Sequence, residues 1–333
     1  FGSTSILPKQ RSCPISHYPI AKDFRNIDVS MPYHKLLFPL AGPVLKLMAH
    51  CVPLLKGLTV SKRSVPGFQG KPFSVELYRP TDKTGNLPCV LLFHGGGFGY
   101  QAAPYHKRLA MAYAQQLGCV TVFPDYHLLP RYPYPAAKED ALAVYQWLHG
   151  QREDLHVDRE KILVSGDSTG AVLATYVAEA TLPGFSRPCG QLLIYPVTGE
   201  GQQTDSIRIF QDTPMWNSKN NRKMWKWYLK GANATQRVEA SPMTAPLRAP
   251  LPPAYIETAE FDCLHDEALL YAQRLRDQGG PGHPLGDEGP GPRIRLLLGF
   301  PHHPRQRPPP GGSYEGDAGK GGLPGERDLT ARC

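Results

Sequence analysis

Short apolar runs alternate with longer helix-like stretches through the middle of the chain. The apolar runs cover residues 88–93, 119–123, 161–165, 191–196 and 254–258. Each has the length and the apolar content of a fully buried strand. The stretches 104–117, 135–149 and 168–182 lie between them and are predicted to be helices. Repeated strand–helix alternation predicts an α/β fold, in which a mostly parallel sheet is flanked by helices.

One catalytic domain with a smaller cap is the expected organisation. The chain has 333 residues, of which 41% are hydrophobic, and this suffices for one large core. The expected parts are an N-terminal helical cap segment at 1–57, an α/β core in two pieces at 58–199 and 249–278, a helical cap insertion at 200–248, and a tail at 279–333. The tail is crowded with Gly and Pro, a composition that buries too little apolar area to offset chain entropy.

The formal net charge of +8 raises the question of an anionic partner. Lys and Arg are scattered along the sequence, so neither nucleic acid nor an anionic membrane is the expected partner. The apolar stretch 36–58 is interrupted by prolines and by charged residues. No integral membrane span is therefore expected there, and an amphipathic cap helix that covers the active site is predicted instead.

Cysteine usage indicates a reducing compartment. The seven cysteines stand at positions 13, 51, 89, 119, 189, 263 and 333, and no two form a C-x-x-C pair. An odd number of widely spaced cysteines favours buried free thiols over a disulfide framework or a zinc site. The first residues carry no basic-then-apolar signal pattern. A cytoplasmic location is therefore expected.

The strongest chemical signal is Gly166-Asp167-Ser168-Thr169-Gly170. It follows the predicted strand 161–165 and opens a helix rich in Ala and Val. In this context G-x-S-x-G predicts a nucleophile elbow, with Ser168 on a sharp turn and small flanking residues that let strand and helix meet. The N-terminus of the helix adds a positive field near the serine. Ser168 is therefore the predicted nucleophile.

A glycine-rich loop, His94-Gly95-Gly96-Gly97-Phe98, directly follows the first buried strand. Consecutive glycines leave backbone N–H groups open to a substrate oxygen. The N–H groups of Gly96, Gly97 and Thr169 are the predicted oxyanion hole. His94 is expected to brace the loop by hydrogen bonds rather than to act as a base. The simpler alternative, a flexible glycine turn, is weakened by the position of the loop on the strand where the fold needs it.

An acidic segment, Glu260-Phe261-Asp262-Cys263-Leu264-His265-Asp266-Glu267, follows the predicted strand 254–258. The acid of a catalytic triad must lie on a loop at the carboxyl end of a strand, after the nucleophile in chain order. Asp262 fits this position best and is the predicted acid. Asp266 and Glu267 are expected in the first turn of a helix, where the helix dipole favours negative charge.

These motifs together resemble the hormone-sensitive-lipase-like family of α/β-hydrolases. Two further segments carry the resemblance, Asp125-Tyr126-His127-Leu128 and Pro133-Tyr134-Pro135-Ala136-Ala137. The likeness extends over residues 55–278. It implies an α/β-hydrolase fold whose cap is built from the N-terminal helices and the central insertion. It also implies a carboxylesterase or lipase acting on small-molecule esters of short or medium acyl chains, with no metal or organic cofactor.

The family pattern continues with a last strand and a catalytic histidine in a His-Gly-Phe context, where this chain has Pro292-Arg293-Ile294-Arg295. Shifting the reading frame by one nucleotide from Gly279 permits codons for Val-His-Gly-Phe-Asp at this point. The same shift permits an amphipathic helix over 314–324. We therefore predict that the tail 279–333 is read in a shifted frame, and that the chain as written is impaired by loss of its catalytic histidine.

A rival interpretation keeps the tail as genuine. The segment 293–298 then forms the last strand, and Gly299-Phe300-Pro301-His302 presents His302 as the base. His303 and His283 are weaker candidates. The extra length that this connection needs is tolerable in a loop.

The predicted chemistry is acyl transfer to water through an acyl-enzyme on Ser168. Two alternatives remain: a small-molecule binder on the same scaffold without turnover, and an amidase or deacetylase that uses the same site. Trp216, Trp225 and Trp227 either line the acyl or alcohol pocket or pack in the core. The sequence does not determine the oligomeric state, and a homodimer is one option.

Overall fold

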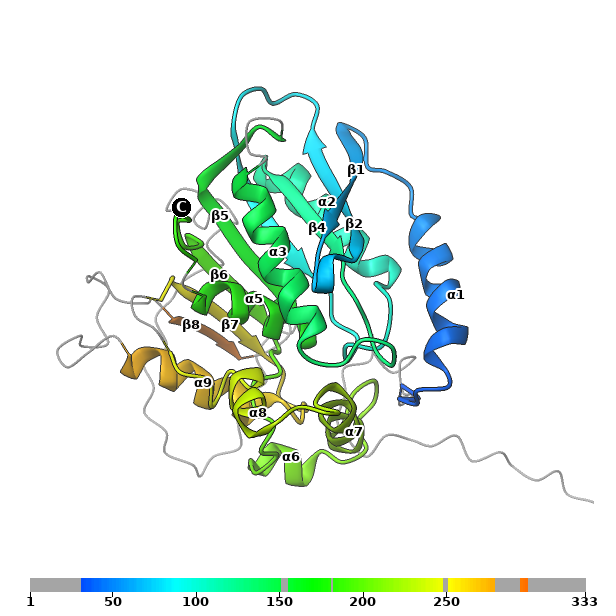
Figure 1. The fold of residues 1–333 in the computed structure, drawn as a ribbon, viewed down its shortest axis with the longest axis vertical. Helices are drawn as coiled ribbons and strands as arrows, with labels where there is room; N and C mark the ends of the chain where they lie inside the picture. The colour runs from blue at the N-terminus through cyan, green and yellow to red at the C-terminus, as the bar shows by residue number, and fades with distance from the viewer. Residues whose placement is uncertain (1–30, 151–154, 181, 248–250, 279–293, 299–333) are drawn as a thin grey trace, which may run out of the picture.

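The computed structural model describes residues 31–150, 155–180, 182–247, 251–278 and 294–298. These residues form one sheet of eight strands in the spatial order β1-β2-β4-β3-β5-β6-β7-β8 (Figure 1). The strands are β1 (Leu58–Pro66), β2 (Pro72–Pro80), β3 (Leu87–Phe93), β4 (Val120–Asp125), β5 (Val157–Asp167), β6 (Gly190–Ile194), β7 (Ala254–Thr258) and β8 (Ile294–Leu298). Neighbouring strands from β4 to β8 are parallel, whereas β2 is antiparallel to β1 and β4. The predicted α/β fold with a mostly parallel sheet is confirmed.

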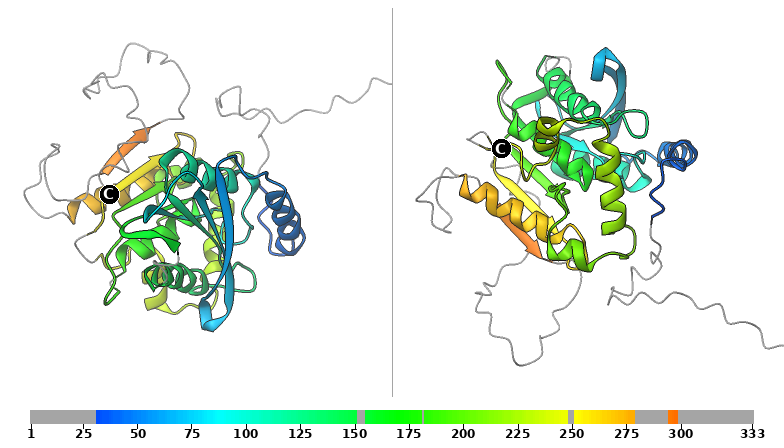
Figure 2. Two further views of the ribbon diagram at one scale, coloured as in Figure 1. Left: turned by 90° about the horizontal axis from the view of Figure 1, so that it is seen from above. Right: turned by 60° about the horizontal axis from the view of Figure 1, so that its bottom comes forward.

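Helices cover both faces of the sheet (Figure 2). They are α1 (Phe38–His50), α2 (Pro104–Leu117), α3 (Ala136–Gly150), α5 (Thr169–Glu179), α6 (Asp205–Ile209), α7 (Ser218–Tyr228), α8 (Ala234–Ala240) and α9 (His265–Asp277), with a short 3-10 turn at Phe68–Gly70. The buried side chains of α3, α5 and α9 join one large core. Those of α2 form a second, smaller core. The predicted helix 104–117 coincides with α2.

The central strand β3 shows why the runs predicted to be buried strands are apolar at nearly every position. Its side chains alternate between the two cores: Cys89, Leu91 and Phe93 belong to the larger one, and Val90 and Leu92 to the smaller one. Both faces of a parallel strand are covered by helices, so apolar residues are needed at every position. A continuous apolar run is therefore the pattern of such a strand.

The stretch 200–248 contains α6, α7 and α8, so its predicted helical character is confirmed. Trp225, which is 2% exposed, packs in the large core beside Tyr228. Trp216 and Trp227 both pack against the ring of Tyr33, at centroid distances of 5.2 and 5.1 Å. Of the two predicted roles of these tryptophans, core packing is the one that these contacts support.

The apolar stretch 36–58 contains the helix α1, which packs against α2 at the margin of the molecule (Figure 1). No helix in the described part of the chain has the length and apolar character to cross a bilayer. At the other end of the sheet, β8 pairs in parallel with β7. Its bounds agree with the last strand expected at 293–298 if the tail is genuine, and the remainder of the tail lies outside the described residues.

Candidate active site

Ser168 lies on the turn between β5 and α5, where its backbone has φ 53° and ψ −118°. A positive φ is costly for a residue with a side chain and persists only where the surroundings fix it. The N–H of Ser168 donates to Ile194 O at 2.9 Å. Its carbonyl accepts from the N–H groups of Ala171 and Val197, both at 3.2 Å. These bonds hold Ser168 at the carboxyl end of β5 and the N-terminus of α5, the geometry of a nucleophile elbow.

Gly166 and Gly170 let the backbones of β3, β5 and α5 come into contact. A Cβ on Gly166 would lie 2.3 Å from the carbonyl carbon of Gly170, and a Cβ on Gly170 would lie 2.2 Å from Phe93 O. The neighbouring atoms belong to backbone, which cannot swing aside as a flexible side chain can. Both glycines are therefore required by packing, as the motif predicts.

We expect Gly170→Ala to lower the free energy of unfolding by about 1–3 kcal/mol, because the added methyl group must push β3 away from α5. Urea unfolding followed by circular dichroism measures the change. Gly201→Ala is the matched control, since a Cβ there would meet no atom within 4 Å. The control should stay within about 0.5 kcal/mol of the parent. Equal stability of the two variants would contradict the packing.

The glycine loop after β3 turns through a run of left-handed backbone. Gly96 has φ 120°, Gly97 has φ 62° and Phe98 has φ 56°. The N–H of Phe98 donates to Thr169 Oγ1 at 3.3 Å. This bond fastens the loop to the residue that follows Ser168. The three predicted oxyanion residues are thereby brought beside the predicted nucleophile.

His94 braces the loop, as expected. Its ring is fully buried and stacks on Tyr126 at a centroid distance of 4.5 Å. His94 Nδ1 lies 2.7 Å from Gly95 O, and the Tyr126 hydroxyl donates to His94 O at 2.7 Å. Burial, and the nearby His106, lower the pKa of His94 to about 4. The ring is therefore neutral at physiological pH and holds the loop through its contacts.

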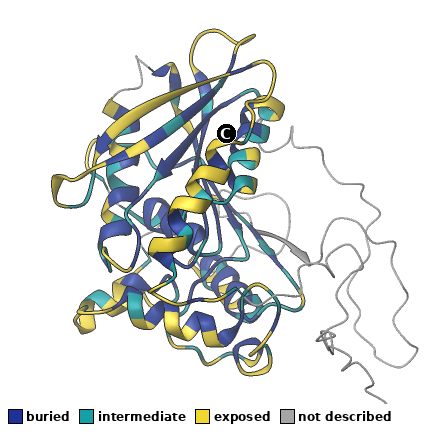
Figure 3. Cartoon of the chain, turned by 90° about the vertical axis from the view of Figure 1, so that its right-hand side faces the viewer, coloured by how far each residue is buried: buried dark blue, intermediate teal, exposed yellow. Residues whose placement is uncertain are grey.

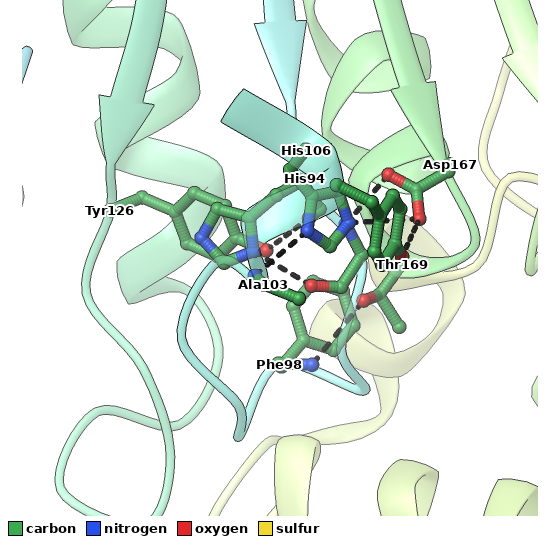
Figure 4. Close-up of polar contacts among 9 residues, drawn as sticks. His94, Phe98, Ala103, His106, Tyr126, Asp167 and Thr169 are labelled. Carbon is green, nitrogen blue, oxygen red and sulfur yellow. Dashed lines mark hydrogen bonds and ion pairs between the residues drawn. The ribbon is translucent and has the colours of Figure 1, made fainter. Parts of the chain in front are cut away.

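Asp167 organises a buried polar cluster that the sequence did not predict (Figure 4). One carboxylate oxygen accepts the N–H of Gly95 at 2.9 Å. The other accepts the Tyr105 hydroxyl at 3.1 Å and lies 3.2 Å from His106 Nε2. Burial raises the pKa of Asp167, but His106 and the Gly95 N–H outweigh it, so that the pKa is lowered overall. The middle residue of the Gly166–Ser168 tripeptide thus ties the glycine loop to the elbow.

The tautomer of His106 follows from its contacts. The N–H of Ala103 donates to His106 Nδ1 at 2.9 Å, so this nitrogen carries a lone pair. A neutral ring then has its proton on Nε2, from which it donates to Asp167. The Gly95 N–H also lies 3.3 Å from His106 Nε2, but a protonated nitrogen cannot accept it. Gly95 therefore bonds to the carboxylate of Asp167.

Asp262 lies on the loop between β7 and α9, as predicted for a triad acid. Its Oδ1 accepts the N–H of Leu264 at 2.9 Å. Burial raises the pKa of Asp262 to about 6. The pKa of Tyr195, just after β6, is raised by burial and then by the charges of Asp167 and Asp262. Asp167 and Asp262 therefore lie at the carboxyl ends of β5 and β7, on either side of β6, which ends just before Tyr195.

The predicted bases His302, His303 and His283 lie outside the described residues, as does the shifted-frame histidine. Among the histidines that the structure does describe, none hydrogen-bonds to Ser168 or Asp262. The described residues also contain no group of three side chains that could hold a metal ion.

Asp266 and Glu267 both lie in the first turn of α9, as predicted. Asp266 accepts the N–H of Ser206 at 2.8 Å. Glu267, however, is buried and accepts the N–H of Thr198 at 2.7 Å, in the loop after β6. Burial raises the pKa of Glu267 to about 8; hydrogen bonds from Thr198 and Gly199 oppose this shift, and the charge of Asp262 adds to it.

We expect Glu267→Gln to flatten the pH dependence of stability. Between pH 4.5, the ordinary pKa, and about 8, the folded chain holds a proton that the unfolded chain has released. The stability of the parent therefore falls as the pH rises through this window. Glutamine stays neutral and keeps an acceptor for Thr198. Melting temperatures across the window measure the effect, with the exposed Glu260→Gln as control. Parallel curves for parent and Glu267→Gln would refute the expectation.

The motif Asp125-Tyr126-His127-Leu128 is held by a second buried carboxylate. Asp140, on α3, is fully buried and accepts both the backbone N–H and the Nδ1 proton of His127, each at 2.7 Å. It also accepts the N–H of Phe68 at 2.8 Å. Asp140 therefore fixes the loop after β4, from which Tyr126 supports His94.

Three comparisons agree with this geometry. A sequence profile described as alpha/beta hydrolase fold matches residues 90–283. The carboxylesterase NlhH of Mycobacterium tuberculosis is 32% identical over 231 residues, which are 68% of this chain and 72% of that protein. An ethyl acetate hydrolase of Pseudomonas putida is 30% identical over 224 residues, covering 66% of this chain and 70% of that protein.

Among solved structures, the esterase LipW from Mycobacterium marinum has a TM-score of 0.71 at 28% identity. The match covers 84% of this chain and 85% of that one. The matched profile spans more than half of the chain, and it contains the elbow, the acidic loop and most of the parallel sheet. The chain belongs to the hormone-sensitive-lipase-like family of α/β-hydrolases.

Proposed function

We propose that this chain is a serine carboxylic ester hydrolase acting on esters of short or medium acyl chains. One observation carries the proposal: Ser168 has a strained backbone at the N-terminus of α5, and the glycine loop is fastened beside it through Phe98 and Thr169. Strain of this kind is maintained where it positions a reacting group. The names of the relatives, a carboxylesterase and an ethyl acetate hydrolase, support ester chemistry.

The reaction proceeds in two acyl transfers. A histidine removes the proton from Ser168 Oγ, which attacks the ester carbonyl and forms an acyl-enzyme. The N–H groups of Gly96, Gly97 and Thr169 stabilise the oxyanion. Asp262 orients the histidine and stabilises its cation. Water then releases the acid by the reverse proton route.

The base comes from the segment after α9. The coding DNA across residues 275–333 decides which histidine it is. A surplus nucleotide near Gly279 supports the shifted frame, in which a His-Gly-Phe segment completes the triad. A confirmed frame excludes it and assigns the role to His302, which follows β8 by a few residues.

Nitrophenyl esters of acetate, butyrate and octanoate, set against a matching anilide, test the substrate class. Turnover of the esters, falling with the longest chain, is the expected result. Preference for the anilide supports an amidase, and saturable binding without turnover supports a small-molecule binder. The buried thiols Cys89, Cys119 and Cys263 agree with a reducing, cytoplasmic location.

A further inference from the structure

The outer side of α1 is apolar. Leu40, Val44, Leu47 and Met48 share this side, with spacings of three and four residues, and Leu36 precedes them. Leu40 is 71% exposed and Leu47 is 64% exposed. The opposite side of the helix already supplies core contacts, because Phe38, Gly42 and Ala49 are buried there. A surface helix ordinarily turns polar residues outward, so these five residues, the α1 face, require a partner of their own.

The helix α7 carries the opposite kind of surface. Its inner side chains, Met224, Trp225 and Tyr228, are buried. Its exposed side chains are all basic, and they recur every three or four residues, so they lie on one side of the helix. They are Lys219, Arg222, Lys223 and Lys226, which we call the α7 face. None of the four forms an ion pair with the described residues. Like charges four residues apart repel each other, so this face favours an external anion.

The two faces are fixed beside each other. The chain just before α1 is bonded to α7 and its approach: Met31 N donates to Met215 O at 3.0 Å, and Asn220 Nδ2 donates to Met31 O at 2.8 Å. Tyr33 stacks on Trp227, with ring planes 19° apart. Phe38, at the start of α1, also lies against α7, with its ring centroid 6.0 Å from that of Trp227.

A hollow of about 290 Å³ lies where the two segments meet. It is lined by Met31, Pro32 and Tyr33 on one side, by Asn217, Lys219, Asn220 and Lys223 on the other, and by Gln211 and Asp212 at its border. The two lysines at this opening suit a phosphate group, although Asp212 reduces the positive charge there. The side of the molecule that carries α1 faces the viewer in Figure 3, where exposed positions recur along the helices.

We propose that the α1 face and the α7 face together dock this protein on an anionic lipid bilayer. The α1 face enters the boundary between headgroups and acyl chains, and the lysines of the α7 face contact lipid phosphates. Residues 31–75 contain no acidic side chain, so a second copy related by twofold symmetry would bring like charges together. A bilayer supplies apolar and anionic partners at once. From the sequence no anionic partner was expected, but four cations lie within eight positions of the chain and α7 places them on one side of a helix.

Sedimentation of the full chain with vesicles tests this proposal independently of ester hydrolysis. The chain is expected to sediment with vesicles of phosphatidylcholine and phosphatidylglycerol in equal parts, and far less with phosphatidylcholine alone. Raising the salt concentration should release it, because salt screens the lysine–phosphate attraction. Absence of binding to the anionic vesicles, or equal binding to both kinds, overturns the proposal.

Two double variants separate the faces. Lys219→Gln with Lys223→Gln should weaken binding roughly 25-fold, since each lysine near an anionic surface contributes about fivefold. Leu40→Ser with Leu47→Ser should weaken it about tenfold or more. The matched control, Leu270→Ser with Lys83→Gln, changes an exposed leucine on α9 and a lysine in the loop before β3 and should bind as the parent does. Melting curves verify that each variant is folded.

Two outcomes refute the proposal. One is vesicle binding that is unchanged in both test variants. The other is a parent dimer that does not bind vesicles and that Leu40→Ser with Leu47→Ser converts to a monomer.

Discussion

In the chain whose reading frame supplies the catalytic histidine, Ser168→Ala is expected to reduce the turnover of nitrophenyl butyrate by roughly four to six orders of magnitude. The substitution removes the only atom that can form the acyl-enzyme, while the glycine loop and the binding surface remain. The fold should persist, because the described hydrogen bonds of Ser168 are all made by its backbone. Burst kinetics on the parent and steady-state rates on the variant measure the effect, with melting curves to verify folding.

Ser165→Ala is the matched control for this experiment. Ser165 lies three positions earlier, on the strand β5 that leads to Ser168, and its buried hydroxyl has no hydrogen-bond partner in the described structure. Removal of that hydroxyl should leave turnover unchanged within about threefold, since it relieves an unsatisfied polar group and changes nothing at the elbow. If Ser168→Ala retains the rate of this control, Ser168 is not the nucleophile.

Short-range patterns predicted most of the fold. The helix α2 and the buried strands follow from local periodicity and from apolar runs, because burial on both faces demands apolar residues at each position. Ser168 and the glycine loop were predictable for a similar reason. A turn that is too tight for a Cβ requires glycine, and the glycines beside Ser168 and after β3 are visible in the sequence. The antiparallel pairing of β2 with β1 and with β4 was not predicted, because an apolar run does not show which strands lie beside it.

Polar contacts between residues far apart in the chain could not be predicted from the sequence. Asp167 and His106 are 61 residues apart, and nothing local marks them as partners. In the sequence, Glu267 looks like an ordinary acidic residue in the first turn of a helix. It is buried because the loop after β6 packs against it, and the sequence does not show that contact. In both cases the chemistry arises from segments that the fold brings together, so it belongs to tertiary structure.

Asp167→Ala is expected to lower the free energy of unfolding by about 3–5 kcal/mol. The alanine leaves the buried Gly95 N–H, the Tyr105 hydroxyl and the His106 Nε2 proton without their shared acceptor. The glycine loop then loses its bond to the elbow, so ester turnover should also fall by roughly 100- to 1,000-fold through the oxyanion hole. Urea unfolding and steady-state kinetics measure the two effects.

Asp167→Asn separates the charge of this residue from its shape. The amide keeps an acceptor for the Gly95 N–H, so its loss of stability should be smaller than that of the alanine variant. Because the folded-state pKa of Asp167 is lowered below 3.8, the parent gains stability from this carboxylate above that pH and loses it as the pH falls through the folded pKa. The asparagine variant lacks this dependence, so its stability should decline less steeply in acid. Equal acid slopes for parent and variant, or an alanine variant as stable as the asparagine one, would show that Asp167 does not hold the glycine loop to the elbow.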